Sequence, residues 1–437
     1  MLDRLFGLTA NGVTPRSEIV AGTTIFFTMA YILFVNPQIL SAAGMDRGAV
    51  FMATALSAAL ATAAMGLVAN LPIALPPGMG PNAFFAFTVV PLLAGDWRLA
   101  LGCVFVSGLL FVALSASPAR EWLVNAIPQS QKRAIGAGIG FFLALIGFQG
   151  AGWVVDSPAT LLQPGRLSDP KALIAALGLV VMAALWVRGV TGAVLIGILT
   201  ATGAALALGL VPLPALTAPM PSILPTLGQL HFSGAAATSI SGSVLASVIL
   251  VFLLLNLLDA SGTLTAVGHR AGLMTDGRLR NARKALLTDA GGTVLGSVLG
   301  TSPVTAYIES AAGQDSSGRG ARTGLAAVTV ALLFLAALLF APLAGAVPAY
   351  ATAPALIFVA ALFMADLKDV AWDDMTEALP ALVTALAIPF TFSIAEGIGM
   401  GFIAYAAVKT LAGRWKEVGA GVAVIALAFA AKVTLGV

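Results

Sequence analysis

Long apolar runs separated by short polar segments recur along almost the whole chain. In windows of about 20 residues, the length that crosses a hydrocarbon layer of roughly 30 Å, these runs predict membrane-spanning helices. Fourteen spans are predicted, at residues 17–37, 48–70, 72–93, 97–117, 133–153, 171–187, 190–211, 243–267, 284–299, 301–316, 323–343, 349–365, 377–393 and 395–411. A further apolar segment, 418–436, is either an added span or a helix lying at the membrane surface.

The composition agrees with this pattern. Of the 437 residues, 59% are hydrophobic and only 9% are charged, which excludes an ordinary soluble domain and indicates a polytopic helical membrane protein. The start of the chain lacks the pattern of a removable signal peptide, so we expect the first span to be retained. The cations behind the net charge of +3 lie mainly in short loops, where orientation in the lipid bilayer explains them better than an anionic partner does, so we expect no nucleic-acid partner.

The placement of Lys and Arg predicts the orientation. A cytoplasmic N-terminus puts all but five of the 22 Lys and Arg residues on the cytoplasmic side, as is typical of multi-pass proteins of the cell (inner) membrane. The five exceptions are Arg47, Arg98, Arg166, Lys171 and Lys432.

Two predicted spans are interrupted by Gly and Pro at corresponding places in the two halves of the chain. The interruptions are LPPGMGPNAFFAF (75–87) in span three and GTSPVTAYIESAAG (300–313) in span ten. Such paired breaks are typical of transporters built from repeats, whose binding site lies between the repeats. With seven spans in each half, an odd number, the second half is expected to be inverted in the membrane.

Two acids lie within this apolar setting. Glu309 follows the break in span ten, and Asp259 shares one helical face of span eight with Asn256 and Thr263. An ionisable group at this depth costs at least about 2.5 kcal/mol, so both acids are candidates for function. The alternative is a carboxylate that caps a broken helix end or braces two helices.

The same region suggests the chemistry of a ligand. Phe84, Phe85 and Tyr307 offer flat faces for a planar ring, although plain packing explains them equally well. An acid whose protonation depends on ligand occupancy can couple proton movement to transport. The sequence has no cluster of metal ligands and no phosphate-binding loop, so we expect no cofactor other than the proton as coupling ion.

Five segments carry a resemblance to a known family. They resemble signature segments of the nucleobase/cation symporter family (the xanthine/uracil permease superfamily), in its adenine/guanine/hypoxanthine permease branch. The segments are FFTMAYILFVNP (26–37), LPPGMGPNAFFAFTVV (75–90), LLDASGTLTAVGHRAGL (257–273), LGTSPVTAYIESAAG (299–313) and PLAGAVPAYATAPALIFVAALFM (342–364). The likeness runs in the same order from about residue 15 to 411.

The resemblance implies an all-α fold of seven plus seven inverted spans, in which short strands of the broken spans three and ten cross near mid-membrane. It implies a core domain (15–118 and 241–345) and a gate domain (119–240 and 346–437), with spans one to four and eight to eleven in the core. It also implies a homodimer through the gate domain. Members of the family typically move nucleobases together with protons.

For this chain the resemblance implies that Asp259 and Glu309 hydrogen-bond the base. We expect the same acids to couple the proton, Asn82 to complete the polar contacts, and Thr263 to support Asp259. Phe84, Phe85 or Tyr307 would stack on the ring. The predicted function is proton-coupled import of purine nucleobases such as hypoxanthine, guanine and adenine.

Two departures from the family pattern affect these expectations. Asn256 stands where the branch commonly has an acid, which leaves the coupling stoichiometry open. Pro81 stands where a larger apolar residue is usual, and we expect it to alter the strand of span three and the substrate preference.

Two alternatives remain at this point. An anion transporter of the sulfate-permease type would share the architecture, but two acids without Lys or Arg at the site would repel an anion. An intramembrane acid/base enzyme is the less favoured alternative, and we expect no enzyme.

Overall fold

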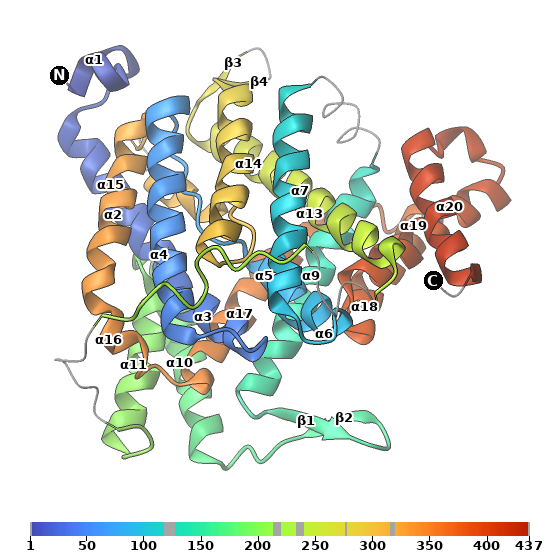
Figure 1. Cartoon of the computed structure of the whole chain (residues 1–437), viewed down its shortest axis with the longest axis horizontal. Helices are drawn as coiled ribbons and strands as arrows, with labels where there is room; N and C mark the ends of the chain where they lie inside the picture. The colour runs from blue at the N-terminus through green and yellow to red at the C-terminus, as the bar shows by residue number, and fades with distance from the viewer. Residues whose placement is uncertain are drawn as a thin grey trace.

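The computed structural model describes residues 2–117, 127–212, 220–232, 240–275, 278–314 and 320–435. Two cations that the sequence places in the cytoplasm, Arg120 and Arg319, lie outside these ranges, as do parts of the long connection 212–240. In Figure 1, helices from the two halves of the chain lie side by side, with α14 between α4 and α7.

The first half contains the elements α1 (Leu2–Phe6), η1 (Thr9–Asn11), α2 (Pro15–Met29), α3 (Ile32–Ala42), α4 (Arg47–Ala64), η2 (Met65–Ala69), α5 (Met79–Ala83), η3 (Phe84–Val89), α6 (Val90–Leu92), α7 (Trp97–Ala116), α9 (Gln129–Gly150), β1 (Val154–Ser157), β2 (Leu161–Pro164), α10 (Pro170–Val187) and α11 (Ala193–Ala207). The elements η2 and η3 are short π-helical turns that continue α4 and α5.

The second half contains α13 (Gly242–Arg270), β3 (Met274–Thr275), β4 (Arg278–Leu279), α14 (Ala282–Leu299), η4 (Ile308–Gly313), α15 (Gly324–Ala337), η5 (Leu338–Phe340), α16 (Ala341–Ala344), α17 (Ala349–Met364), η6 (Ala365–Asp369), α18 (Met375–Thr391), α19 (Ile394–Leu411), η7 (Trp415–Glu417) and α20 (Ala420–Leu435). The strands form two small antiparallel hairpins, β1–β2 and β3–β4, which the apolar pattern did not predict.

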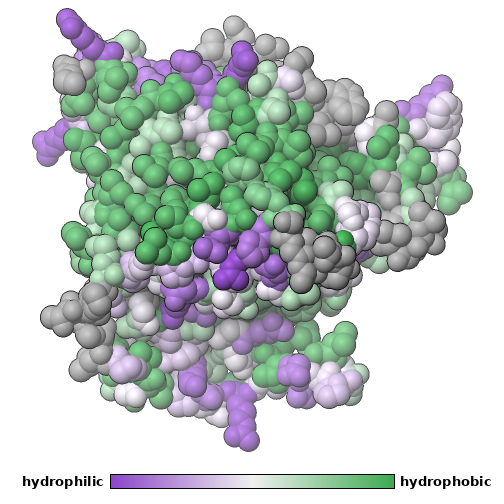
Figure 2. Space-filling view, in the orientation of Figure 1, coloured by the Kyte–Doolittle hydropathy of each residue, from purple (hydrophilic) through white to green (hydrophobic). Residues whose placement is uncertain are grey.

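The helices are those of an integral membrane protein. In the described ranges, eight helices are long and apolar enough to cross a membrane, and shorter apolar helices accompany them. Large apolar side chains such as Leu60, Leu109 and Leu335 point outward, and Figure 2 shows apolar residues covering much of one face of the molecule. The mostly helical membrane fold is therefore confirmed, whereas the count of fourteen spans and the inverted repeat stay predictions.

Polar caps explain where several of these apolar helices begin. The Thr14 hydroxyl accepts from the Ser17 amide ahead of α2, and Asp46 accepts from the Ala49 amide ahead of α4. Asp96 caps α7 in the same way. A side-chain oxygen at this position satisfies an amide that the helix leaves unpaired, so these helices begin at their polar flanks.

The helices pack in two groups. One group contains α2, α4, α7, α14 and α15, and the other contains α9, α10, α17, α18 and α19. Close approach in the first group requires glycine, since a Cβ on Gly324 would lie 1.9 Å from the Gly66 carbonyl oxygen. The two groups consist of helices assigned above to the core and gate, but the domain bounds themselves stay a prediction.

Two outlying segments rest on the helices. In the long connection, the Gly228 amide donates to the Val298 carbonyl (2.7 Å) at the end of α14, and the His231 amide donates to the Arg98 carbonyl (3.1 Å) at the start of α7. The segment α20 lies beside α19, at the red end of the chain in Figure 1. One face of α20 packs inward through Val422, while Leu427 is 69% exposed, so the choice between a span and a surface helix stays open.

Candidate functional site

The two broken spans cross one another as extended antiparallel segments. Residues 74–78 and 303–307 lie side by side, with an isolated bridge between Pro77 and Val304. Backbone hydrogen bonds join them from the Gly78 amide to Pro303 (2.8 Å), from Thr305 to Pro76 (3.1 Å) and from Tyr307 to Ala74 (3.1 Å). The two segments expected to be strands of spans three and ten are thus extended and joined by one isolated bridge, and we call this pair the crossing ribbon; its position at mid-membrane stays a prediction.

Proline explains why these spans are not continuous helices. Pro76, Pro77 and Pro303 lack an amide hydrogen and push the preceding residues into extended backbone. Buried amides of the ribbon that face away from the partner segment need other acceptors. Side chains supply them: the Leu75 amide donates to Thr62 Oγ1 (2.9 Å), Ala74 to Ser310 Oγ (3.0 Å) and Ala306 to Asp289 Oδ1 (2.8 Å).

Asp289 positions the backbone of the crossing ribbon, a role that was not predicted from the sequence. It lies on α14, is fully buried, and its Oδ1 accepts a hydrogen bond from the backbone of the crossing ribbon. The signal for it was present, because an acid stands in the apolar, Gly-rich segment of predicted span nine. Its partner is a backbone amide, which no side-chain pattern reveals.

Glu309 lies directly after the ribbon, in the first turn of η4. Its Oε1 accepts a hydrogen bond from the hydroxyl of Tyr31 (2.8 Å), which is 1% exposed and stands between α2 and α3. Tyr31 falls in the first signature segment but was not singled out from the sequence. Span one therefore holds the acid of span ten in place.

Asp259 lies on α13, and the structure brings it together with Glu309. Helix α13 packs against η4, so Asp259, Glu309 and Tyr307 belong to one group of side chains, in which negative charges on the two acids would repel one another. The Thr263 hydroxyl lies 3.5 Å from Asp259 Oδ1, at the outer limit of a hydrogen bond. Among the described residues, no Lys, Arg or His forms an ion pair with either acid.

Asn82 follows the ribbon on the span-three side, in α5. It is fully buried, and its Oδ1 accepts from the Ser302 hydroxyl, which belongs to the break in span ten. Its Nδ2 has no partner among the described residues. Asn82 therefore links the two breaks and keeps a free donor.

The three candidate aromatic residues are packed within the protein. Phe84 and Phe85 are at most 1% exposed, and Phe84 meets Phe252 of α13 edge to face, with ring centroids 4.9 Å apart. The Tyr307 hydroxyl donates to the Pro77 carbonyl (2.6 Å) and so fastens the crossing ribbon. Packing accounts for all three in this conformation, and stacking on a ligand stays a prediction.

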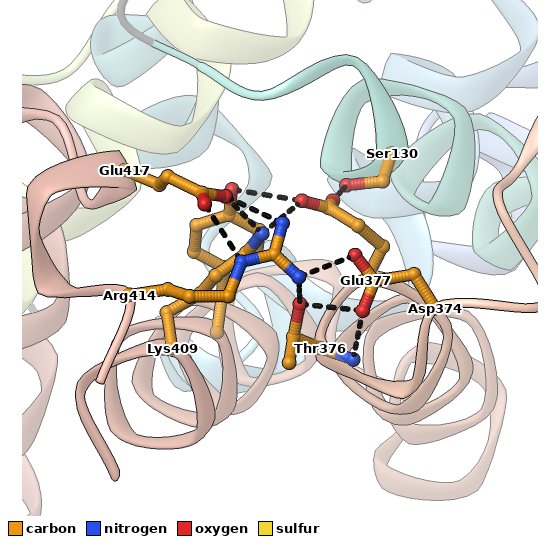
Figure 3. Close-up of polar contacts among 8 residues, drawn as sticks. Ser130, Asp374, Thr376, Glu377, Lys409, Arg414 and Glu417 are labelled. Carbon is orange, nitrogen blue, oxygen red and sulfur yellow. Dashed lines mark hydrogen bonds and ion pairs between the residues drawn. The ribbon is translucent and has the colours of Figure 1, made fainter. Parts of the chain in front are cut away.

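A second polar group contrasts with these acids. Figure 3 shows it where α9, α18 and α19 meet, and we call it the ionic cluster. Lys409 is fully buried and contacts Glu377 (2.7 Å) and Glu417 (2.6 Å). The cluster consists of Ser130, Asp374, Thr376, Glu377, Tyr405, Lys409, Arg414 and Glu417.

Charges in the ionic cluster are mutually satisfied. Arg414 contacts Asp374 and Glu417, each at 2.7 Å. Hydrogen bonds from Arg414 and Lys409 lower the pKa of Glu417 to about 2, and hydrogen bonds from Thr376 and Arg414 hold the pKa of Asp374 well below its usual range. The sequence reading used these cations only for orientation and missed the cluster.

Several known proteins are similar to this chain over almost its whole length. Residues 16–400 match the model of a family described as the permease family. A putative permease of Methanocaldococcus jannaschii is 47% identical over 98% of this chain and 97% of its own. Adenine permease AdeP of Escherichia coli is 43% identical (99% and 96% covered), and guanine/hypoxanthine permease PbuG of Bacillus subtilis is 44% identical (93% of each).

Solved structures share the fold at low sequence identity. The transmembrane domain of the cyanobacterial bicarbonate transporter BicA matches with a TM-score of 0.66 at 16% identity, over 87% of this chain and 96% of that one. SLC26A9 matches with a TM-score of 0.63 at 11% identity, over 91% of this chain and 65% of that one. These similarities concern the arrangement of helices alone.

Proposed function

This chain belongs to the permease family that its residues 16–400 match, and on that premise we propose that it carries purine nucleobases across the membrane. Membership confirms the family predicted from the signature segments and identifies a transporter rather than an enzyme. Relatives named as adenine and guanine/hypoxanthine permeases support purine bases as substrates.

The single observation that carries the proposal is the pair of Asp259 and Glu309. Both lie beside the crossing ribbon, both are unpaired with any described cation, and each acts on the other electrostatically. Ionised carboxylates only accept hydrogen bonds, so they suit the ring and exocyclic N–H groups of a neutral base. An anion such as sulfate or bicarbonate would be repelled here, which disfavours the alternative that the fold alone permits.

The other candidate residues take supporting roles in this proposal. Asn82, whose Nδ2 has no hydrogen-bond partner in the described part of the chain, completes the polar contacts together with backbone groups of the two breaks. Phe84, Phe85 or Tyr307 stacks on the base after a change of conformation, and Thr263 supports Asp259.

We propose that transport is import coupled to protons. Asp259 and Glu309 are the titratable groups of the proposed site, so one of them would carry the coupling proton. Alternating access would come from movement of the gate domain (119–240 and 346–437) against the core domain (15–118 and 241–345). The protein would work as a homodimer through the gate domain, with its N-terminus in the cytoplasm.

Uptake by the purified protein in proteoliposomes tests the proposal. Labelled hypoxanthine, adenine and guanine are offered with an inward proton gradient and with the gradient collapsed. We expect uptake that the gradient drives, recovery of the label in unchanged base, and competition by unlabelled bases but not by sulfate or bicarbonate. Absence of uptake for all three bases, or competition by the anions alone, would refute the proposal.

A further inference from the structure

A groove between α4 and α14 opens on the outer face of the helix bundle. It has a volume of about 330 Å³ and is lined by the end of α4, by η2 and by one face of α14. Its floor lies where Ala61 meets Gly292, since a Cβ on Gly292 would be 3.2 Å from the Ala61 Cβ. On its rim, Leu60 and Val68 are 48% and 53% exposed. Both helices lie on the apolar face turned to the viewer in Figures 1 and 2, so the groove opens toward the surrounding lipid.

The shape and the lining of the groove fit a hydrocarbon chain. The α14 side is formed by Leu287, Gly291 and Leu295 together with Thr288, whose hydroxyl already donates to the Lys284 carbonyl of the same helix (2.8 Å). A helix rises about 12 Å from residue 287 to residue 295. One leaflet of a bilayer has a hydrocarbon layer of about 15 Å, half of the whole core. The groove is therefore long enough to hold most of one acyl chain.

A positive charge stands at one end of the groove. Lys284 lies in the first turn of α14, four residues before Thr288 and seven before Gly291, so it shares their face of the helix. Its side chain is exposed and forms no ion pair with a described residue. The neighbouring Arg283 points elsewhere, because its Nη2 meets the Ala116 carbonyl at the end of α7 (3.5 Å). Lys284 is thus the cation that a lipid headgroup above this groove would meet.

We propose that this groove binds an anionic phospholipid, with one acyl chain between α4 and α14 and the phosphate paired with Lys284. A zwitterionic lipid fits the same slot, but its own cation competes for the phosphate, so the site prefers a net negative headgroup. The opposite face of α14 carries Asp289, which accepts from the crossing ribbon. The bound lipid therefore packs behind the helix that positions the ribbon. The inference rests on the membrane location of the protein and does not depend on which substrate it carries.

Native mass spectrometry of the purified full chain in detergent tests the headgroup contact. The protein is titrated with dioleoyl phosphatidylglycerol and, separately, with dioleoyl phosphatidylcholine, and the dissociation constant of the first bound lipid is measured. Lys284→Gln should weaken phosphatidylglycerol binding about fivefold, the size expected for one Lys near an anionic headgroup, and leave phosphatidylcholine unchanged. Arg283→Gln is the matched control, because it removes an adjacent exposed cation on another face of α14, and it should bind both lipids like the parent.

A second variant tests the acyl-chain slot. A Cβ on Gly291 would meet no atom within 4 Å, so Gly291→Leu is compatible with the fold and places its side chain in the groove. Both lipids should then bind at least about tenfold more weakly, because several methylene groups lose their contact with the protein. Gly203→Leu is the matched control: Gly203 is exposed on α11, and a Cβ there also meets nothing within 4 Å. Lipid binding to Gly203→Leu should equal that of the parent.

The possible outcomes either support the lipid site or overturn it. Equal lipid affinities in the parent, Lys284→Gln and Gly291→Leu would show that the groove holds no lipid. Equal affinities of the parent for the two lipids would refute the headgroup contact. If Gly291→Leu abolishes a dimer seen in the parent spectrum while lipid binding stays unchanged, a second copy of the chain occupies the groove and the proposal is wrong. None of these results bears on base uptake, which is measured separately.

Discussion

Acidic side chains gather in two regions of this molecule, and their surroundings are opposite. At the crossing ribbon, Asp259 and Glu309 act on each other, and the side-chain hydrogen bonds they accept come from the hydroxyls of Thr263 and Tyr31. In the ionic cluster, each acid contacts Lys409 or Arg414 at 2.6 to 2.7 Å. The first pair has no ion-pair partner among the described residues, whereas the second set is paired with cations of the protein.

The contrast teaches how to separate functional from structural acids in a membrane protein. A buried charge needs a partner, and a protein that supplies a cation uses the pair to fix its own helices. A protein that leaves two acids near each other without a cation keeps an unfavourable arrangement that a ligand or a proton relieves. Substitutions in the two regions should therefore change different quantities.

The largest effect on stability is expected from Lys409→Met. Removing the buried cation leaves Glu377 without a positive partner, with only the hydroxyls of Ser130 and Tyr405 beside it, which should lower the free energy of unfolding by about 3 kcal/mol. Thermal unfolding in detergent measures the change, and Lys416→Met, at an exposed position in η7, is the control. The affinity of the folded protein for the base should stay at the parent value. If Lys409→Met has the same melting temperature as the parent, the ionic cluster does not stabilise the protein.

Tyr31→Phe should act on binding instead. The variant removes the hydroxyl that donates to Glu309 (2.8 Å), and a hydrogen bond to a charged group of this kind corresponds to about tenfold in affinity. Tyr350→Phe is a matched control, because the Tyr350 hydroxyl has no partner among the described residues. Equal base affinities for the two variants would argue against a role of Tyr31 in holding the site.

Acid should weaken the ionic cluster. The pKa of Glu417 is lowered to about 2 from an ordinary 4.5, so its contribution to stability is present above about pH 4.5 and is lost as the pH falls toward 2. Asp374 shifts in the same direction and adds to the loss. We expect a small decrease in melting temperature over this range, because these groups are exposed and screened.

Arg414→Gln provides the check on that pH dependence. Without the guanidinium, Glu417 and Asp374 should titrate closer to their ordinary values, and the acid-dependent decrease should shrink. An unchanged pH profile in Arg414→Gln would exclude these pairs as its cause.

The smallest effect is expected from Thr263→Val. The Thr263 hydroxyl lies 3.5 Å from Asp259, too far for a strong hydrogen bond, so base affinity should change by no more than about twofold. Thr265→Val, whose side chain is exposed on the same helix, should have no effect. A large loss in Thr263→Val alone would mean that this contact tightens when substrate binds.

The sequence predicted the features that depend on local pattern. The extended segments are predicted by three prolines, Pro76, Pro77 and Pro303. A proline interrupts a continuous helix because it lacks an amide hydrogen and clashes with the preceding turn. Long apolar runs likewise predicted the helices, although polar first turns extend several of them, so that α9 begins at Gln129 rather than at residue 133.

Contacts between distant residues were beyond that pattern. Tyr31 and Glu309 are separated by 278 positions, and their hydrogen bond depends on how α2 and α3 pack against η4. The ionic cluster depends on the packing of α9, α18 and α19 in the same way. That the buried amide of Asn256 has no hydrogen-bond partner among the described residues is likewise visible only in the folded structure.

Equilibrium binding of labelled hypoxanthine to three isosteric variants tests the central claim most directly. Asp259→Asn and Glu309→Gln should each weaken binding by at least about 100-fold, because each replaces a charged acceptor in a site built for N–H groups. Glu377→Gln, the matching change in the ionic cluster, should bind like the parent while melting at a lower temperature. Parent-like affinity in both Asp259→Asn and Glu309→Gln would contradict the account.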